Sequence, residues 1–571
     1  MLSKKSKNNN GITLVALVIS IIILLILATI SIQSLTNTGL FAKAQEAKEK
    51  TQNATENQAK TLNEYEDELN KYVSENKDKT DWTGKVNKPK LMTGMEAIKF
   101  IDPTGDEKAN EGSVVKTTDA DTAWYDYDAK KWANAQTQDG SMWVWIPRFA
   151  YRVNKSTQTF DVVFLEGTTD YYYENGEKKE AKRQKTENET VDTTTGYTVH
   201  PAFTNESSIN YANGGWDKEL TGIWVSKFKA GYASGNNSTT VKESSVKYTQ
   251  ASALVGGTEL GSSNNWGTAR NYLDGEYGIK SGDIYTFKNG TSPSIKYPTF
   301  QGLTYSMNYI NHNDAFNISK ALTESGNIYG LSNSSTDSHM MKNSEWGAVA
   351  YLSQSKYGLN GTNIYINNVN LNNTAKSVYA VTGCAGATAD ASPVATTITE
   401  LNNRTTSGIY VWTQKSGTKA STTGTIYGIY DMSGGTWERT AGLVNNGNSN
   451  LSTYGQSLMN ALNNEKSSKY VTVYPHDSSV DKTGANIDAA CEANWKANTQ
   501  IYGDGIHETS TAGTKKTSWY GDYSYFQAVD NPFNVRGGHC GDVDGAGLLC
   551  FTRSSGSSYY NNGFRSVLVA Q

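Results

Sequence analysis

Residues Gly428–Glu438 read GIYDMSGGTWE, and this stretch decides how the rest of the chain is interpreted. The alternating apolar run Ile426–Tyr430 predicts a short strand. Gly434 and Gly435 predict a tight turn after it, because glycine lacks the Cβ that disfavours left-handed backbone conformations. We expect Trp437, just beyond the turn, to fill a core position.

Similar short runs lie on either side of this stretch. Loops rich in Gly, Asn, Ser and Thr separate Ser141–Phe149, Gly222–Phe228 and Gly408–Gln414, which all have strand-like alternation. Their irregular spacing excludes a propeller or solenoid repeat. Asn343–Ser353 has Trp346 and other apolar residues on one side, which predicts a helix.

The composition limits the class of protein. The 571 residues include 35 Tyr and 13 Trp, which is too aromatic for a disordered chain. With 52 basic and 56 acidic residues the net charge is -4, and this balance argues against a nucleic-acid-binding protein. The six histidines form no HxH or HxxxH pair, so we predict no metal site.

Three motifs, in this order, resemble those of formylglycine-generating-enzyme-like (sulfatase-modifying-factor-like) domains. They are NSEWGAVA from Asn343, the Gly428–Glu438 stretch, and Arg536-Gly537-Gly538 followed by Gly563-Phe564-Arg565. The resemblance implies an α+β, loop-rich C-type-lectin fold for a head with insertions over residues 81–571. Arg565 is expected to pair with a buried carboxylate. The expected scaffold residues are Glu345, Trp346, Gly434, Trp437, Glu438, Arg536, Gly537, Gly538, Phe564 and Arg565.

The N-terminal residues predict a membrane anchor. Residues 1–11 carry three lysines, and Ile12–Ile32 is almost wholly apolar. A helix of that length spans about 31 Å, enough to cross a bilayer core. We therefore predict a transmembrane helix over residues 12–34, with the C-terminal domain outside a single-pass, cell-surface protein. A removable signal peptide is the alternative, but its apolar region would be shorter.

The segment NGITLVALVIS, Asn10–Ser20, resembles the leader of type IV pilins and pseudopilins. That resemblance implies cleavage between Gly11 and Ile12, and pilin-like assembly as one kind of partner. Pilins usually carry Glu at the fifth mature position, where this chain has Ala16, which disfavours filament formation. An apolar stripe that includes Leu62, Tyr65 and Leu69 predicts a helical stalk over residues 35–80, with a solvated spacer as the alternative.

The C-terminal segment 536–571 has an unusual composition. Residues 536–570 contain no Lys, Glu, Gln, Met or Trp. Mutating both adenines of an asparagine codon reaches every residue type except those five. Ile and Pro are also absent, which this scheme does not require. The pattern is similar to the variable region of proteins diversified by retroelements, in which error-prone copying at adenines rewrites residues that face a ligand. The positions that this resemblance assigns to ligand binding are His539, Cys540, Asp542, Val543, Asp544, Cys550, Arg553, Ser554, Ser555, Ser557, Ser558, Tyr559, Tyr560, Asn561 and Asn562.

The sequence therefore predicts a surface-displayed, membrane-anchored, ligand-binding protein with a diversified C-terminal face. Its partner would be an unknown protein or a cell-surface ligand. The first alternative is a structural pilin or pseudopilin subunit. The second is a copper-dependent oxidase, but the related enzymes hold copper with two closely spaced cysteines, whereas Cys540 and Cys550 are ten residues apart. We thus predict no enzyme activity and no cofactor. Ca²⁺ stays open although no ligand spacing requires it, and so does a disulfide between the two cysteines.

Overall fold

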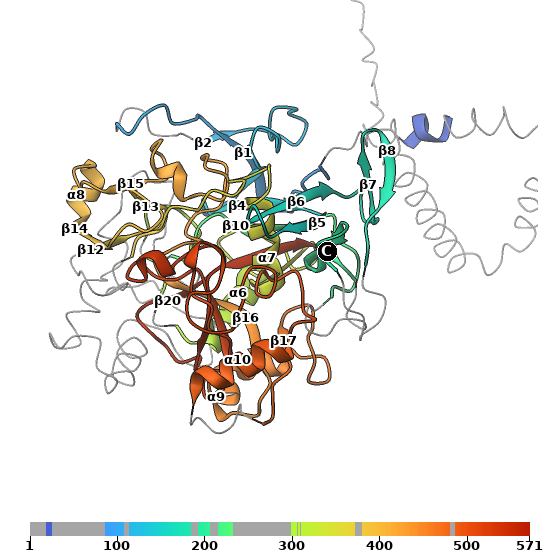
Figure 1. Cartoon of the computed structure of the whole chain (residues 1–571). Coiled ribbons are helices and arrows are strands. Elements are labelled where there is room, and N and C mark those ends of the chain that lie inside the picture. The colour runs from blue at the N-terminus through green and yellow to red at the C-terminus, as the bar shows by residue number, and fades with distance from the viewer. Residues whose placement is uncertain are drawn as a thin grey trace, which may run out of the picture. The chain divides into compact units, whose positions relative to one another are not determined.

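The structure is a computed structural model. It describes residues 19–24, 86–107, 114–183, 192–205, 215–231, 298–371 apart from 305 and 309, 380–479 and 486–571. The chain divides into two units, residues 1–82 and 83–571. In the first unit the structure describes Ile19–Leu24, which is helical and exposed. All elements named below belong to the second unit (Figure 1).

The predicted fold class, an α+β C-type-lectin fold behind a long N-terminal membrane and stalk helix, is wrong. From residue 86 onward the regular elements of the described residues are mostly strands, and the longest of the five α-helices has 12 residues. The helices are short because Gly, Asn, Ser and Thr interrupt the apolar periodicity before it extends over many turns.

The predicted single-pass membrane localisation is also wrong, because no described helix has both the length and the apolar character needed to cross a membrane. Hydropathy reports only side-chain preference, whereas a span also needs continuous helical backbone. Of the predicted span 12–34, the structure describes Ile19–Leu24, and these residues are helical. The rest of the span, the leader with its Gly11–Ile12 cleavage site, and the stalk 35–80 lie outside the described residues.

The largest sheet is antiparallel and has seven strands. Its order is β11-β21-β10-β4-β3-β1-β2. At its centre Trp224 of β10 stands opposite Trp145 of β4, and both side chains are buried, as the alternation in these runs predicts. The strand bounds are Thr336–Met340 for β11, Ser566–Ala570 for β21, Gly222–Ser226 for β10, Met142–Pro147 for β4, Asn134–Thr137 for β3, Met95–Phe100 for β1 and Val114–Lys116 for β2.

A second sheet carries the predicted variable region. Its order is β17-β16-β18-β19, and β20 pairs in parallel with β16. Every residue of β16 is buried, whereas β19 pairs with one strand of the ladder, β18, and its last residues are half-buried. The bounds are Thr472–Tyr474 for β17, Trp437–Val444 for β16, Phe533–Arg536 for β18, Phe551–Ser554 for β19 and Asn562–Phe564 for β20.

Smaller sheets and the helices complete the second unit. The strands are β5 (Phe149–Asn154), β6 (Thr159–Phe164) and β9 (Thr198–Val199) in one sheet, β7 (Tyr171–Glu174) with β8 (Glu177–Glu180), β12 (Val369–Leu371) with β14 (Val394–Thr396), and β13 (Cys384–Gly386) with β15 (Ile409–Val411). The helices are α6 (His312–Lys320), α7 (Asn343–Ser353), α8 (Ile398–Asn403), α9 (Ser449–Asn460) and α10 (Ile487–Ala497). The predicted helix over Asn343–Ser353 is confirmed as α7, and all of its residues are buried.

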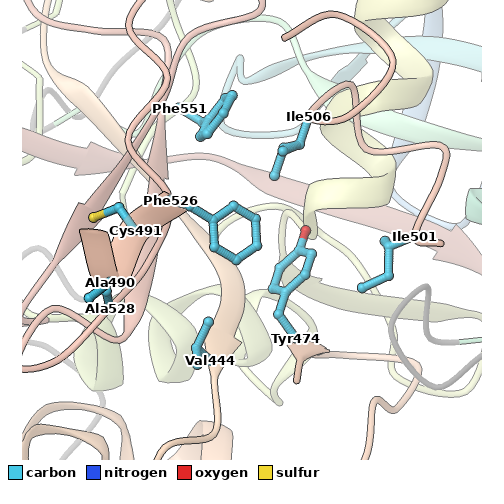
Figure 2. Packing of buried hydrophobic residues seen from close by; sticks show 9 residues of the cluster. All are labelled: Val444, Tyr474, Ala490, Cys491, Ile501, Ile506, Phe526, Ala528 and Phe551. Carbon is cyan, nitrogen blue, oxygen red and sulfur yellow. The ribbon is translucent and has the colours of Figure 1, made fainter. Parts of the chain in front are cut away.

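A buried apolar cluster supports the start of β19. Figure 2 shows Phe551, the first residue of β19, near Phe526 and Tyr474. The Tyr474 hydroxyl donates a hydrogen bond of 2.7 Å to Asp504, so its polar end is satisfied inside the core. The members are Val444, Tyr474, Ala490, Cys491, Ile501, Ile506, Phe526, Ala528 and Phe551. β19 therefore rests on a packed core at one end.

The predicted strand over Ile426–Tyr430 is wrong, because that segment forms turns and irregular backbone. The buried Lys227 amine explains the difference: it donates to the carbonyl oxygens of Ile426 (2.6 Å) and Gly428 (2.8 Å). A side chain thus satisfies carbonyls that a neighbouring strand would otherwise bind. Lys229, also buried, donates to Gly434 O at 2.7 Å. Burial lowers its pKa to about 8.

Arg565 joins the two large sheets. It lies between β20 and β21, and its guanidinium makes two hydrogen bonds to the Glu438 carboxylate, at 2.8 and 2.9 Å. It also donates to the carbonyl oxygens of Ser226 (2.6 Å) and Tyr430 (2.8 Å). Both charged side chains are 1 % exposed. The ion pair between them therefore offsets most of the free energy that each group loses when it is removed from water.

We expect Glu438→Gln to destabilise the protein by about 3–5 kcal/mol, because it leaves the Arg565 charge buried without its partner. The control is Glu96→Gln, which breaks the ion pair with Lys116, where the side chains are 58 % and 72 % exposed. That change should cost about 0–1 kcal/mol. Urea unfolding followed by tryptophan fluorescence measures both, and equal costs would contradict the role given to Arg565.

Candidate functional site

The predicted variable residues lie on three consecutive pieces of the chain. The first is the loop of residues 539–544, which enters the short 3₁₀ helix Val543–Gly545. The second is β19, with Cys550 just before it, and the third is the loop of residues 555–562, which leads into β20. We call the side chains of these pieces that reach solvent the variable face.

The predicted positions differ in their exposure to solvent. Asp544 is exposed, with 64 % of its side chain accessible. Four positions are buried: Cys540, Cys550, Asn561 and Asn562. The half-buried ones are His539, Asp542, Val543, Arg553, Ser554, Ser555, Ser557, Ser558, Tyr559 and Tyr560. The variable face therefore consists of Asp544 and the half-buried positions, and the four buried positions lie beneath it.

Cys540 and Cys550 are both buried thiols. Cys550 packs in a small apolar cluster with Trp437 and Val535, and Tyr523 covers the cluster. Burial raises the pKa of the Cys550 thiol well above its ordinary value, so this group is neither a thiolate nor a nucleophile. The disulfide that the sequence leaves open is not formed.

Residues outside the variable region hold the first variable loop and the end of the third loop through main-chain hydrogen bonds. The amide of Cys540 donates to Gly435 O at 3.0 Å, and the amide of Trp437 donates to Asn561 O at 2.7 Å. Gly434 has a φ of 78°, and a Cβ at this residue would lie 2.5 Å from Asn367 O. The glycine turn of the GIYDMSGGTWE stretch is thus required for the close approach of its own backbone to Asn367.

The loop after β19 is also held by its carbonyl oxygens. The amide of His312 donates to Gly556 O at 3.0 Å. The Arg439 guanidinium donates to Ser557 O, and the Asn308 side-chain amide donates to Tyr560 O at 2.6 Å. These bonds use atoms that every residue type possesses, so they persist when the side chains of the loop change.

Arg439 is positioned by buried partners of its own. It donates to Ile310 O at 2.9 Å and to Nδ1 of His312 at 2.6 Å. His312 therefore acts as an acceptor at Nδ1, and burial next to Arg439 lowers its pKa so that the ring stays neutral. Burial also lowers the pKa of Arg439 to about 9. The guanidinium that holds the loop is consequently fixed in place by the core.

Most side-chain contacts within the variable face are local. The hydroxyl groups of Ser555 and Ser557 are 3.0 Å apart, and the ring centroids of Tyr559 and Tyr560 are 4.5 Å apart. His539 Nε2 lies 3.3 Å from an Asp542 carboxylate oxygen. Burial lowers the pKa of His539 and raises the pKa of Asp542.

The face offers hydroxyl, phenol, imidazole, carboxyl and guanidinium groups for binding. Among the described residues, no group of three or more His, Cys, Asp or Glu side chains is arranged to hold a metal ion. Hydroxyl groups and phenol rings can make hydrogen bonds and aromatic contacts with another molecule.

The predicted scaffold residues lie beneath the face. Arg536 stacks on Trp346, with 5.4 Å between the guanidinium carbon and the ring centroid, and donates to the carbonyl oxygens of Cys550 and Asp504, each at 2.9 Å. Trp346 donates to Leu548 O at 2.7 Å. The variable region is thus supported from inside between residues 548 and 550.

The remaining scaffold residues secure neighbouring turns and elements. Glu345 accepts a hydrogen bond from the Lys342 amide at 2.8 Å, which caps α7, and its other oxygen lies 2.9 Å from the buried His339. Gly537 and Gly538 have φ values of 83° and 74°, which glycine adopts without strain. Phe564 is fully buried in β20.

Sequence reasoning missed Asn308, His312 and Arg439. Arg439 directly follows the recognised Glu438 within β16, and this adjacency was the one available signal for it. No local pattern marks Asn308 or His312, because their partners lie more than 120 residues away in the chain. Comparison of the chain with protein-family models finds no match, and comparison with curated protein sequences finds no significant one.

We expect aspartate to lower the free energy of unfolding by different amounts at two predicted variable positions. Ser558→Asp should change the free energy of unfolding by about 0.5 kcal/mol or less, because Ser558 is half-buried in a loop. Cys550→Asp should cost about 2–4 kcal/mol, because it places a carboxyl group in the apolar cluster around Trp437. Chemical denaturation compares the two variants, and a Ser558→Asp variant as unstable as Cys550→Asp would contradict the assignment of the face.

Proposed function

We propose that this chain is a ligand-binding protein whose C-terminal face is diversified by a retroelement. The ligand is bound by the variable face, and its identity changes with the residues there. The protein acts by recognition and not by catalysis. The proposal concerns the C-terminal region alone and includes no membrane anchor.

The observation that carries the proposal is the way in which the variable region is held. The amide of His312, the Arg439 guanidinium and the Asn308 side chain bind carbonyl oxygens of residues 556–560, whereas most side chains of that loop are half-exposed. Because these hydrogen bonds involve main-chain atoms of the loop, they do not depend on which side chains the loop carries. Substitutions at the surface usually alter the free energy of unfolding by about 0.5 kcal/mol or less. The absence of Lys, Glu, Gln, Met and Trp from residues 536–570 supports exchange at asparagine codons.

The residue types on the face support a protein ligand. Tyr559 and Tyr560 provide large, rigid contact area at low entropic cost, and Ser555, Ser557 and Ser558 provide adaptable hydrogen bonding, as in antibody loops. The Cys550 thiol packs against Trp437 and Val535 instead of reaching the surface, which supports binding over a copper oxidase that needs accessible thiolates.

The DNA beside the gene provides the first test. We expect a template repeat near its 3′ end that differs from codons 539–562 only at adenines, together with a reverse transcriptase gene. Genome sequencing measures this directly. A neighbourhood with neither feature would remove diversification and leave a binding protein with a fixed face.

A displayed library tests binding itself. The full chain, randomised at the half-buried and exposed positions of the variable face, should yield binders when selected separately against lysozyme, streptavidin and ubiquitin. The control library randomises the hairpin of residues 171–180, whose carbonyl oxygens accept no hydrogen bond from Arg439, His312 or Asn308. Binders from the first library should have a Kd at least about tenfold lower, since one well-placed aromatic contact supplies over 1 kcal/mol. Equal recovery from both libraries would contradict the proposal.

A further inference from the structure

A second surface borders the variable face and lies outside the region of unusual composition. Residues 522–526 read DYSYF, and their side chains alternate: Asp522, Ser524 and Phe526 are buried, whereas Tyr523 and Tyr525 are half-buried on the other side. The two phenol rings lie side by side with centroids 6.3 Å apart. We call Tyr523, Tyr525 and Lys516 the constant flank.

The constant flank joins two pieces of the variable region. The amide of Tyr523 donates to Gly545 O at 2.9 Å, next to the first variable loop. The amide of Phe551 donates to Tyr523 O at 2.9 Å, and the amide of Tyr525 donates to Phe551 O at 3.0 Å, so the same segment lines the start of β19. A ligand on the variable face would therefore border Tyr523 and Tyr525.

Side chains of the flank also contact predicted variable residues. The Lys516 amine forms an ion pair with Asp544 and lies 5.2 Å from the centroid of the Tyr523 ring. The Arg553 guanidinium lies 6.0 Å from the Tyr525 ring. The flank thus continues the variable face on the side of residues 544 and 553.

The buried side of the segment holds the flank rigidly. Asp522 accepts a hydrogen bond from the Leu549 amide at 3.0 Å, and the Ser524 hydroxyl accepts one from the Thr517 amide at 3.0 Å. The Ser524 amide donates to Lys515 O at 2.8 Å, which fixes the backbone beside Lys516. Preorganised aromatic residues bind at a low entropic cost, because little freedom is lost on association.

The two phenol hydroxyl groups are available to a ligand. No hydrogen bond joins the hydroxyl of Tyr523 or of Tyr525 to another residue in the described part of the chain. Buried tyrosines in this protein do use theirs, as Tyr474 does with Asp504. Tyrosine is enriched in binding hot spots because it combines apolar area with a polar tip.

We infer that the constant flank is a fixed part of the ligand-binding face and contacts a protein ligand whatever residues occupy the variable positions. This inference rests on the proposed function, since it extends the same face. The ligand class is a protein surface with hydrogen-bonding and acidic groups, because the fixed side chains of the flank are the two neighbouring phenols of Tyr523 and Tyr525 and the Lys516 amine. The variable residues choose the ligand, and the flank adds affinity that is common to all choices.

The binders selected against lysozyme, streptavidin and ubiquitin provide the test. Tyr523→Ala and Tyr525→Ala, introduced separately into each full-length binder, should raise the Kd for its selected protein about tenfold. The matched control is Tyr171→Ala with Tyr173→Ala on β7, a pair that is also exposed at alternate positions and has Lys178 4.4 Å from the Tyr171 ring. The control should change the Kd less than twofold. Surface plasmon resonance measures all of them.

The outcomes separate the two claims. If binders emerge and lose affinity when the selected residue at position 559 is replaced by alanine, but keep it on Tyr525→Ala and Lys516→Glu, the flank is not part of the face and the proposed function stands. If no library member binds, the proposed function fails and the inference fails with it. Tyr523 also covers the Cys550 cluster, so circular dichroism checks each variant, and Tyr525→Ala with Lys516→Glu decides the matter should Tyr523→Ala unfold.

Discussion

The fold depends on the placement of the buried Arg565 charge. A guanidinium without hydration needs all its partners in position, and here those partners come from β16, from β10 and from the loop at Tyr430. Because Arg565 lies between β20 and β21, these contacts fix the point where the variable region ends and the last strand begins. The position of a surface loop is thereby determined by an interaction in the core.

A second buried arginine fixes the other end of the same region. Arg536 ends β18, stacks on Trp346 and binds the carbonyl oxygens of Cys550 and Asp504. The residues between Arg536 and Arg565 are consequently a chain segment with both ends anchored. Arg439 then holds its middle at Ser557 O. Three buried cations thus hold points along this backbone, and the buried side chains of Cys550 and Phe551 anchor it to the core between them.

Part of this arrangement could be predicted from the sequence. The short runs around Trp145 and Trp224 indicated strands, and the structure buries every residue of β4 and β10. The strand predicted at Ile426–Tyr430 was wrong because a lysine from β10's neighbourhood, Lys227, binds its carbonyls, and no local pattern reveals a partner about 200 residues away. The long N-terminal helix is likewise not among the described elements, since the structure describes only Ile19–Leu24 of its span.

The candidate face shows the same division between local and distant information. Codon composition points to a segment, but it depends on the nucleotide template and not on the direction of a side chain. It therefore groups the buried Cys550 with the half-buried Ser558. The hydrogen bonds to carbonyl oxygens of the variable loop could not be predicted from the sequence either, because Arg439 and Ser557 are 118 residues apart.

The buried positions determine how much variation the face can accept. Exchange at half-buried positions costs about 0.5 kcal/mol or less, whereas a polar or oversized residue at Cys540, Cys550, Asn561 or Asn562 costs several times more. Since a domain has only about 5–15 kcal/mol of stability, two such losses remove much of it. Under the proposed function, selection for folding acts on these four positions before selection for binding acts on the rest. Small residues should then persist beneath a face whose exposed residues vary widely.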